Sequence, residues 1–201
     1  MKYDPRIHNR RSIRLKGYDY SQAGAYFVTM CTQNRKYMFG NVVDGEMVLN
    51  DAGRMVQTVW DEIPKYYYGI EIDEFVIMPD HVHGIIVLVR AAPRGRPVNE
   101  NIMNRETPEQ GQPRRVARTG LLLSLPDIVH RFKTMTTKLY TDGVKQHGWP
   151  AFPGRLWQRN YYERIVRNEI ALNRIRRYII NNPMKWEHDR KKPRQHSRGD
   201  K

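Results

Sequence analysis

The sequence predicts a single α+β domain in which an antiparallel sheet carries helices on its faces. Short runs rich in β-branched and aromatic residues alternate with segments whose apolar residues recur every three or four positions. The order of these segments is strand, helix, strand, strand, helix, strand, followed by an extra helix. The length of 201 residues is enough for one such domain with tails.

The four core strands are predicted from their β-branched and aromatic residues, and a separate hairpin from a turn signal. The hairpin turns at Asp44-Gly45, a pair that favours short β-hairpins. The second and third core strands are joined by a tight turn at Pro79-Asp80. The core strands are expected at residues 25–33, 70–79, 82–89 and 157–166, and the hairpin at 40–49.

Three helices are predicted from apolar spacing and from capping signals. Asn50 and Ser124 are good N-caps for the first two, and Pro64 is expected to end the first. The third begins at about residue 169 and is expected to end at Asn181-Asn182-Pro183. The first two helices are expected at about 51–63 and from the Ser124 cap to about 146. The complete order predicts a ferredoxin-like split βαβ sheet with an extra C-terminal helix.

Composition divides the chain into one folded domain and basic segments around it. Residues 1–23 form a basic arm, 24–188 the domain, and 189–201 a polar, basic tail. Within the domain, residues 90–120 contain four prolines, repeated arginines and almost no aliphatic pattern. This stretch is interpreted as a mobile basic insertion.

The charge of the chain points to a polyanionic partner. Lys and Arg number 35 against 21 acidic residues, so the formal net charge is +14, and the pI is about 10.0. Such an excess most often indicates nucleic acid. No apolar run approaches the roughly 20 residues of a spanning helix, no secretory signal is visible, and the single cysteine, Cys31, can form no internal disulfide. A cytoplasmic, nucleoid-associated protein that does not bind membranes is expected.

The stretch His81-Val82-His83 is the strongest chemical signal, because it opens a predicted strand. Side chains two apart on a strand point to the same face, so the two imidazoles can converge on one metal ion. Two histidine ligands leave coordination positions open for other groups, which a metal used in chemistry requires. The alternative interpretation is two ordinary polar residues on a solvated face.

A metal beside a very basic surface suggests phosphodiester chemistry, which needs a nucleophile. This nucleophile could be metal-bound water or a side chain. Tyr140 is a candidate because it lies on an amphipathic helix off the buried stripe, and Lys133, seven residues earlier, could hold the phosphate. Tyr161 and Tyr162 are rival candidates, and most of the 12 tyrosines are expected to serve in packing.

Four stretches of the sequence together resemble the single-tyrosine HUH (His–hydrophobic–His) transposases, and most closely their REP-associated branch. They are FVIMPDHVHGIIV at 75–87, FKTMTTKLY at 132–140, LWQRNYYE at 156–163 and YIINNP at 178–183. The resemblance covers about residues 20–188. It implies a metal-dependent endonuclease and transferase that acts on single-stranded DNA.

The resemblance also implies roles for individual residues. His81 and His83 would bind Mg²⁺ or Mn²⁺, which suits phosphate oxygens as further ligands. Tyr140 would attack a phosphodiester, form a 5′-phosphotyrosine link and free a 3′-hydroxyl, with Lys133 in support. Members of the family recognise imperfect DNA hairpins and often act as homodimers, so both are expected here.

Two positions depart from the family pattern. The residue before the first histidine is often Asn in the family and is Asp80 here, where a carboxylate could join the metal shell or orient an imidazole. Relatives can supply a third ligand one turn after the tyrosine, but Val144, which occupies that position, cannot ligate. Asp142, Gln146 or Asp80 could take its place.

DNA contacts are expected from arginines on the predicted surface, where they could track a phosphate backbone. The candidate DNA contacts are Arg94, Arg96, Arg114, Arg115 and Arg159.

Two other functions remain open. One is a hairpin-binding protein without catalytic activity, to which Asp80 and Val144 point. The other is a metal-dependent nuclease that uses water and needs no Tyr140.

Overall fold

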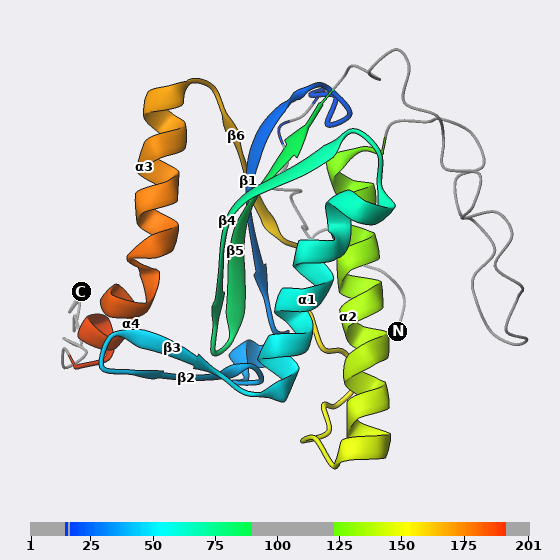
Figure 1. Cartoon of the computed structure of the whole chain (residues 1–201), viewed down its shortest axis with the longest axis vertical. Coiled ribbons are helices and arrows are strands. Elements are labelled where there is room, and N and C mark those ends of the chain that lie inside the picture. The colour runs from blue at the N-terminus through cyan, green and yellow to red at the C-terminus, as the bar shows by residue number, and fades with distance from the viewer. Residues whose placement is uncertain (1–14, 16, 90–122, 192–201) are drawn as a thin grey trace, which may run out of the picture.

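The computed structural model describes residues 15, 17–89 and 123–191 (Figure 1). The basic insertion predicted at 90–120 lies outside these residues, as do most of the predicted arm and tail. None of the helices that are described is both long and apolar enough to cross a membrane.

The core is a four-stranded antiparallel sheet in the order β4-β5-β1-β6. Strand β1 comes from the first third of the chain and lies in the middle of the sheet, and β6 comes from the last third and lies at one edge. This is the strand order of the ferredoxin-like layout. This confirms the predicted α+β class. The strands are β1 (Gly24–Cys31), β4 (Ile70–Met78), β5 (His81–Leu88) and β6 (Tyr162–Val166).

The predicted hairpin is also present, as a separate two-stranded sheet of β2 (Gly40–Val43) and β3 (Glu46–Leu49). Its tip is Asp44-Gly45, and both residues have positive φ, at 50° and 79°. Such angles characterise the tight turns that Asp-Gly pairs favour, because Gly carries no Cβ and Asp tolerates this region.

Four helices accompany the sheet: α1 (Asp51–Tyr66), α2 (Leu125–His147), α3 (Glu169–Ile180) and α4 (Asn182–Lys191). A short 3-10 turn, η1 (Gln33–Arg35), follows β1. The Asn50 side chain accepts a hydrogen bond from Gly53 N, and the Asp127 carboxylate accepts one from Ser124 N, as expected at helix N-termini.

Three predicted boundaries were wrong. Helix α1 continues past Pro64, because in the last turn the missing N–H affects a single backbone hydrogen bond. Strand β6 begins at Tyr162 instead of 157, and Trp157 forms only an isolated bridge with Thr32. Helix α4 was not predicted; it begins at Asn182, within the expected stop, and includes residues that were assigned to the tail.

The two faces of the sheet bury different helices, as Figure 1 shows. The side chains of β5 point alternately to one face of the sheet and to the other. Val82, Ile86 and Leu88 belong to the large core cluster that includes residues of α1 and α2. Ile85 belongs to a smaller cluster with Ile175 and Ile179 of α3. His81 and His83 are four and two residues before Ile85 on the same strand, so their side chains point to the same face as Ile85. The histidine pair therefore lies on the face that α3 covers.

Gly84, between these histidines and the aliphatic run, allows β5 to approach α1. A Cβ at this position would lie 2.5 Å from Trp60 Cζ2 and 2.9 Å from Phe75 Cδ2. The Trp60 and Phe75 rings are stacked, with centroids 4.2 Å apart. A side chain on Gly84 would therefore have to displace this pair.

We expect Gly84→Ala to lower the free energy of unfolding by about 1–3 kcal/mol, the usual cost of overpacking a core. The change is read from the midpoint of urea unfolding. Because the indole supplies the closest atoms, Trp60→Phe should recover part of the loss when combined with Gly84→Ala. Strictly additive losses in the double variant would contradict this explanation.

Candidate active site

The candidate site begins at the first residue of β5, where two histidine rings meet. The Nε2 atoms of His81 and His83 lie 3.0 Å apart. Both residues are buried, at 5% exposure each. The predicted convergence of the pair is thus present, and both rings turn the same nitrogen toward one point.

The other nitrogen of each ring is held by a neighbouring side chain. His81 Nδ1 lies 2.5 Å from Asp80 Oδ1, and His83 Nδ1 lies 2.7 Å from Thr29 Oγ1. Asp80 in turn lies 3.6 Å from the guanidinium Nε of Arg35. Partners of this kind set the orientation of ligating histidines in metal sites. Asp80 therefore orients an imidazole, which was one of its two expected roles.

The residues at this point fit a divalent metal ion. Two nitrogens that are each about 2.1 Å from a common ion and 3.0 Å from each other subtend about 90°, the angle between neighbouring ligands of an octahedral ion. Burial lowers the pKa of His83 to about 3, with smaller contributions from His81 and Arg35. His83 is therefore neutral at physiological pH, the state in which imidazole binds metal.

Tyr178 of α3 is the tyrosine next to the histidine pair. Its hydroxyl oxygen lies 3.3 Å from His83 Nε2, and its ring contacts those of His83 and Phe27, with centroids 5.2 and 6.0 Å away. Tyr178 is 40% exposed. A hydroxyl in this position is accessible to a large substrate while it stays beside the candidate metal ligands.

Asn182 is the polar residue one helical turn after Tyr178. The chain continues as a helical turn through the junction of α3 and α4, since Lys185 N donates to Asn181 O at 3.2 Å. Trp186 is four residues after Asn182, and its ring lies 5.5 Å from the ring of His81. Asn182, which lies between Tyr178 and Trp186 in the sequence, is buried. Its amide oxygen is a candidate third ligand.

No group of three His, Cys, Asp or Glu side chains is close enough to hold a metal within the described part of the chain. The candidate ligand set is therefore two imidazoles and one amide. Such a set leaves positions open for water or for a phosphate oxygen.

Tyr140, the predicted nucleophile, lies on the opposite face of the sheet. It is 1% exposed, packs against Trp149 and Phe152, and donates its hydroxyl proton to Pro150 O at 3.0 Å. Burial raises its pKa, which disfavours the ionised form that attacks phosphorus. The structure corrects the prediction: Tyr140 is a core residue and does not share a site with the histidines.

Lys133, predicted to support that nucleophile, is also placed elsewhere. Its ammonium group donates to Gln158 O at 2.9 Å and to Asn160 O at 3.0 Å, and it lies over the Tyr161 ring. These contacts fix the segment that leads into β6. Lys133 therefore has this supporting role, which corrects the catalytic one.

The remaining predicted residues contribute little to the site. Val144 belongs to the large core cluster, and Asp142 and Gln146 are on the same helix, α2. Arg159 is exposed, as a DNA contact requires. The other four arginines proposed as DNA contacts, Arg94, Arg96, Arg114 and Arg115, lie outside the described residues.

Tyr178 and Asn182 were missed because the final helix had been interpreted through its apolar spacing alone. Tyr178 is one of the predicted apolar positions of this helix, and Asn182 is part of its predicted stop. The signal that could have identified them is a tyrosine and an asparagine one turn apart, in the YIINNP stretch that also carries the family resemblance.

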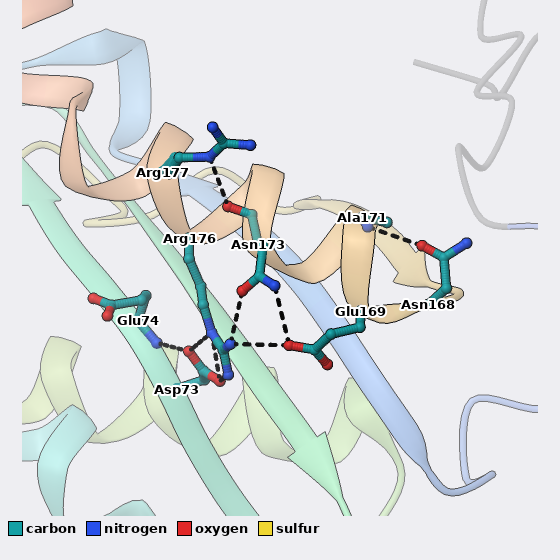
Figure 2. A network of polar contacts seen from close by, with 8 residues as sticks. All are labelled: Asp73, Glu74, Asn168, Glu169, Ala171, Asn173, Arg176 and Arg177. Carbon is teal, nitrogen blue, oxygen red and sulfur yellow. Dashed lines mark hydrogen bonds and ion pairs between the residues drawn. The ribbon is translucent and has the colours of Figure 1, made fainter.

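An ion pair between α3 and the edge strand β4 holds the helix that carries Tyr178 (Figure 2). Arg176 donates from Nε to Asp73 Oδ1 at 2.9 Å and from Nη2 to Oδ2 at 2.6 Å. The apolar contact of α3 with the sheet is small, with Ile175 and Ile179 as its buried residues. The two-pronged ion pair is therefore an important part of the attachment.

We expect this attachment to weaken in acid, because the hydrogen bond from Arg176 lowers the pKa of Asp73. A lowered folded-state pKa contributes stability above the unfolded pKa of about 3.9, and this is lost as pH falls through the folded value. Asp73→Asn should speed amide hydrogen exchange in α3 severalfold at neutral pH. In the wild type, exchange corrected for its intrinsic rate should approach that of the variant in acid. Glu74→Gln is the matched control and should leave α3 protected; equal effects of both changes would contradict this assignment.

Comparison with known proteins relates the chain to one sequence and to solved structures. No protein-family model matches it. An uncharacterised protein of Haemophilus influenzae (strain Rd) is 38% identical over 189 residues, which cover 94% of this chain and 96% of that protein. A similarity of this extent shows common family membership.

The structure of a REP-associated tyrosine transposase bound to a REP hairpin aligns with a TM-score of 0.50 and 16% identity, over 87% of this chain and 74% of that one. A putative transposase from Deinococcus radiodurans R1 aligns with a TM-score of 0.41 and 18% identity, over 85% and 97% of the two chains, which is too distant to bear on the fold. The chain belongs to the same family as the Haemophilus influenzae protein and has the fold of the REP-associated tyrosine transposase.

Proposed function

We propose that this protein is a metal-dependent endonuclease and strand transferase that acts on single-stranded DNA beside a hairpin, with Tyr178 as its nucleophile. The observation that carries the proposal is the 3.3 Å separation between the Tyr178 hydroxyl and His83 Nε2, which itself lies 3.0 Å from His81 Nε2. A nucleophile and a pair of metal ligands at one point are the parts that phosphodiester transfer requires.

In the proposed reaction, Tyr178 Oη loses its proton to solvent and attacks a phosphorus atom of the DNA backbone. The bond between Oη and phosphorus forms, and the bond between phosphorus and the 3′ oxygen of the preceding nucleotide breaks. That oxygen takes up a proton and becomes a free 3′-hydroxyl, while the 5′ phosphate stays on Tyr178. A 3′-hydroxyl can attack this link in reverse and rejoin a strand, so no external energy source is needed.

His81, His83 and the Asn182 amide would hold the metal ion, with Mg²⁺ or Mn²⁺ as the expected ion. When bound, it would polarise a non-bridging phosphate oxygen and neutralise the charge that develops on phosphorus. Asp80 and Thr29 keep the Nε2 atoms directed at the ion through their hydrogen bonds to the Nδ1 atoms. His81, His83 and Tyr178 meet within a single chain, so we infer that one monomer can supply both the metal ligands and the nucleophile.

The choice of a DNA hairpin rests on the fold and on charge. The REP-associated transposase with the same fold was solved with a REP hairpin, and the net charge of +14 favours a polyanion. Homodimer formation is a separate proposal, which sedimentation with and without DNA would test.

The test uses a hairpin with single-stranded extensions from the flanks of the gene, labelled at either end and incubated with Mn²⁺ or EDTA. We expect the 3′-labelled strand to shift to a protease-sensitive adduct on a denaturing gel, and the 5′-labelled strand to become shorter. Both changes should require metal. Cleavage without a shifted 3′ label would indicate a nuclease that uses water, and binding without cleavage would indicate a non-catalytic hairpin-binding protein.

A further inference from the structure

Strand β6 presents an exposed aromatic side chain and a guanidinium on the same face of the sheet as the candidate site. Tyr162 pairs with Thr29, and Arg164 pairs with Phe27, in the antiparallel register of β6 and β1. Directly opposed residues of antiparallel strands share a face. Thr29 bonds His83, and Phe27 contacts both His83 and Tyr178. The two β6 side chains are therefore each one strand away from residues that touch the site.

In the part of the chain that the structure describes, no hydrogen bond, ion pair or ring contact of either side chain explains its position. Tyr162 is 63% exposed although it follows the buried Tyr161, and Arg164 is exposed as well. Among the described residues, no ring stacks on Tyr162, and no carboxylate pairs with Arg164. On an edge strand, an exposed aromatic ring beside an exposed guanidinium matches the pattern of proteins that bind single-stranded nucleic acid.

The distance between Tyr162 and the candidate site also suits a single strand of DNA that contacts both. Strand β6 is separated from β5 by β1 alone, so Tyr162 lies about two strand spacings, roughly 10 Å, from His83. Stacked nucleotides rise about 3.4 Å each, so a strand whose phosphate is at Tyr178 passes β6 within a few nucleotides.

We propose that Tyr162 and Arg164 form a subsite for the single-stranded DNA next to the cleaved phosphate. One unpaired base stacks on the Tyr162 ring, and a backbone phosphate binds Arg164. This inference rests on the proposed function and deepens it, because it identifies residues that position the substrate without taking part in bond breaking.

The test measures equilibrium binding by fluorescence anisotropy in the Tyr178→Phe background, so that no covalent link forms. The probe is the hairpin with its single-stranded extensions, and a second set carries one abasic nucleotide at each extension position in turn. Tyr162→Ala should weaken binding roughly 5- to 150-fold, and Tyr162→Trp should preserve it. At one abasic position the loss caused by Tyr162→Ala should disappear, because the stacking partner is already absent. Arg164→Ala should reduce the salt dependence of binding by about one phosphate contact.

Matched control variants lie on the opposite side of the molecule. Tyr66→Ala removes a tyrosine that is 70% exposed at the end of α1, and Arg54→Ala an exposed arginine of the same helix; neither should change binding. Unchanged affinity of Tyr162→Ala, or an equal loss on every abasic probe, would overturn the subsite. If the effect of Tyr162→Ala disappears at one abasic position (the abasic coupling) but the wild type forms no adduct, the subsite stands and the nucleophile assignment fails. An adduct without the coupling would support the nucleophile and overturn the subsite, and no binding at all overturns both.

Discussion

Replacing Tyr178 with Phe should abolish the covalent protein–DNA adduct while leaving the fold intact. The substitution removes the attacking oxygen alone and retains the ring, whose contacts with Phe27 and His83 are made by carbon. Loss of a nucleophile from an enzyme that acts through a covalent intermediate commonly costs on the order of 10⁴-fold or more in rate. The measurement is adduct formation on a denaturing gel, with circular dichroism to verify folding.

Tyr140→Phe is the matched control for this result. Here the lost hydroxyl bonds Pro150 O inside the core, so the expected effect is on stability, at about 1 kcal/mol, with adduct formation preserved. Thermal unfolding measures the first effect and the gel the second. If Tyr140→Phe eliminated the adduct and Tyr178→Phe did not, the nucleophile would be Tyr140, and the site would have to rearrange across the sheet.

The second large effect is expected for the histidine pair. His83→Ala should reduce Mn²⁺ affinity by more than about 100-fold, because it removes a ligand, whereas loss of a supporting hydrogen bond typically costs 10- to 100-fold. Asp80→Asn and Thr29→Val test the smaller range, since each weakens the contact to one Nδ1 atom. Electron paramagnetic resonance of free Mn²⁺ measures binding without any DNA.

The control for the metal experiment is His130→Ala, which removes an exposed histidine of α2. It should bind Mn²⁺ as the wild type does. Equal Mn²⁺ affinity in the wild type and in His83→Ala would contradict the metal centre, even if DNA cleavage were lost in both His83→Ala and Tyr178→Phe. The binding measurement thus separates a metal ligand from a residue that matters only for folding.

Much of the architecture could be predicted because its signals are local. The turn at Asp44-Gly45, the caps at Asn50 and Ser124, and the strand alternation depend on residues within a few positions of each other. The convergence of His81 and His83 is of the same kind, since a strand has a period of two and β5 starts at His81. The order of the elements was also sufficient to predict the sheet that the structure contains.

The partner of the histidine pair was decided by long-range packing. An amphipathic pattern shows that one side of a helix is buried, but not which face of a sheet it covers. Helix α2 packs with α1 in the large core, which buries Tyr140, whereas α3 covers the opposite face with Tyr178 at its end. With 12 tyrosines in the chain, local sequence could not single out one.

By itself, the sequence determined the class of fold, the basic character of the protein and the histidine pair, because each depends on composition or on neighbours along the chain. Only the tertiary structure decided that Tyr178 joins that pair, that Asn182 is buried one turn later, and that Lys133 and Tyr140 lie elsewhere. The physical reason is that strand periodicity aligns residues two apart, whereas residues 95 positions apart meet only where a helix docks on one particular face of the sheet.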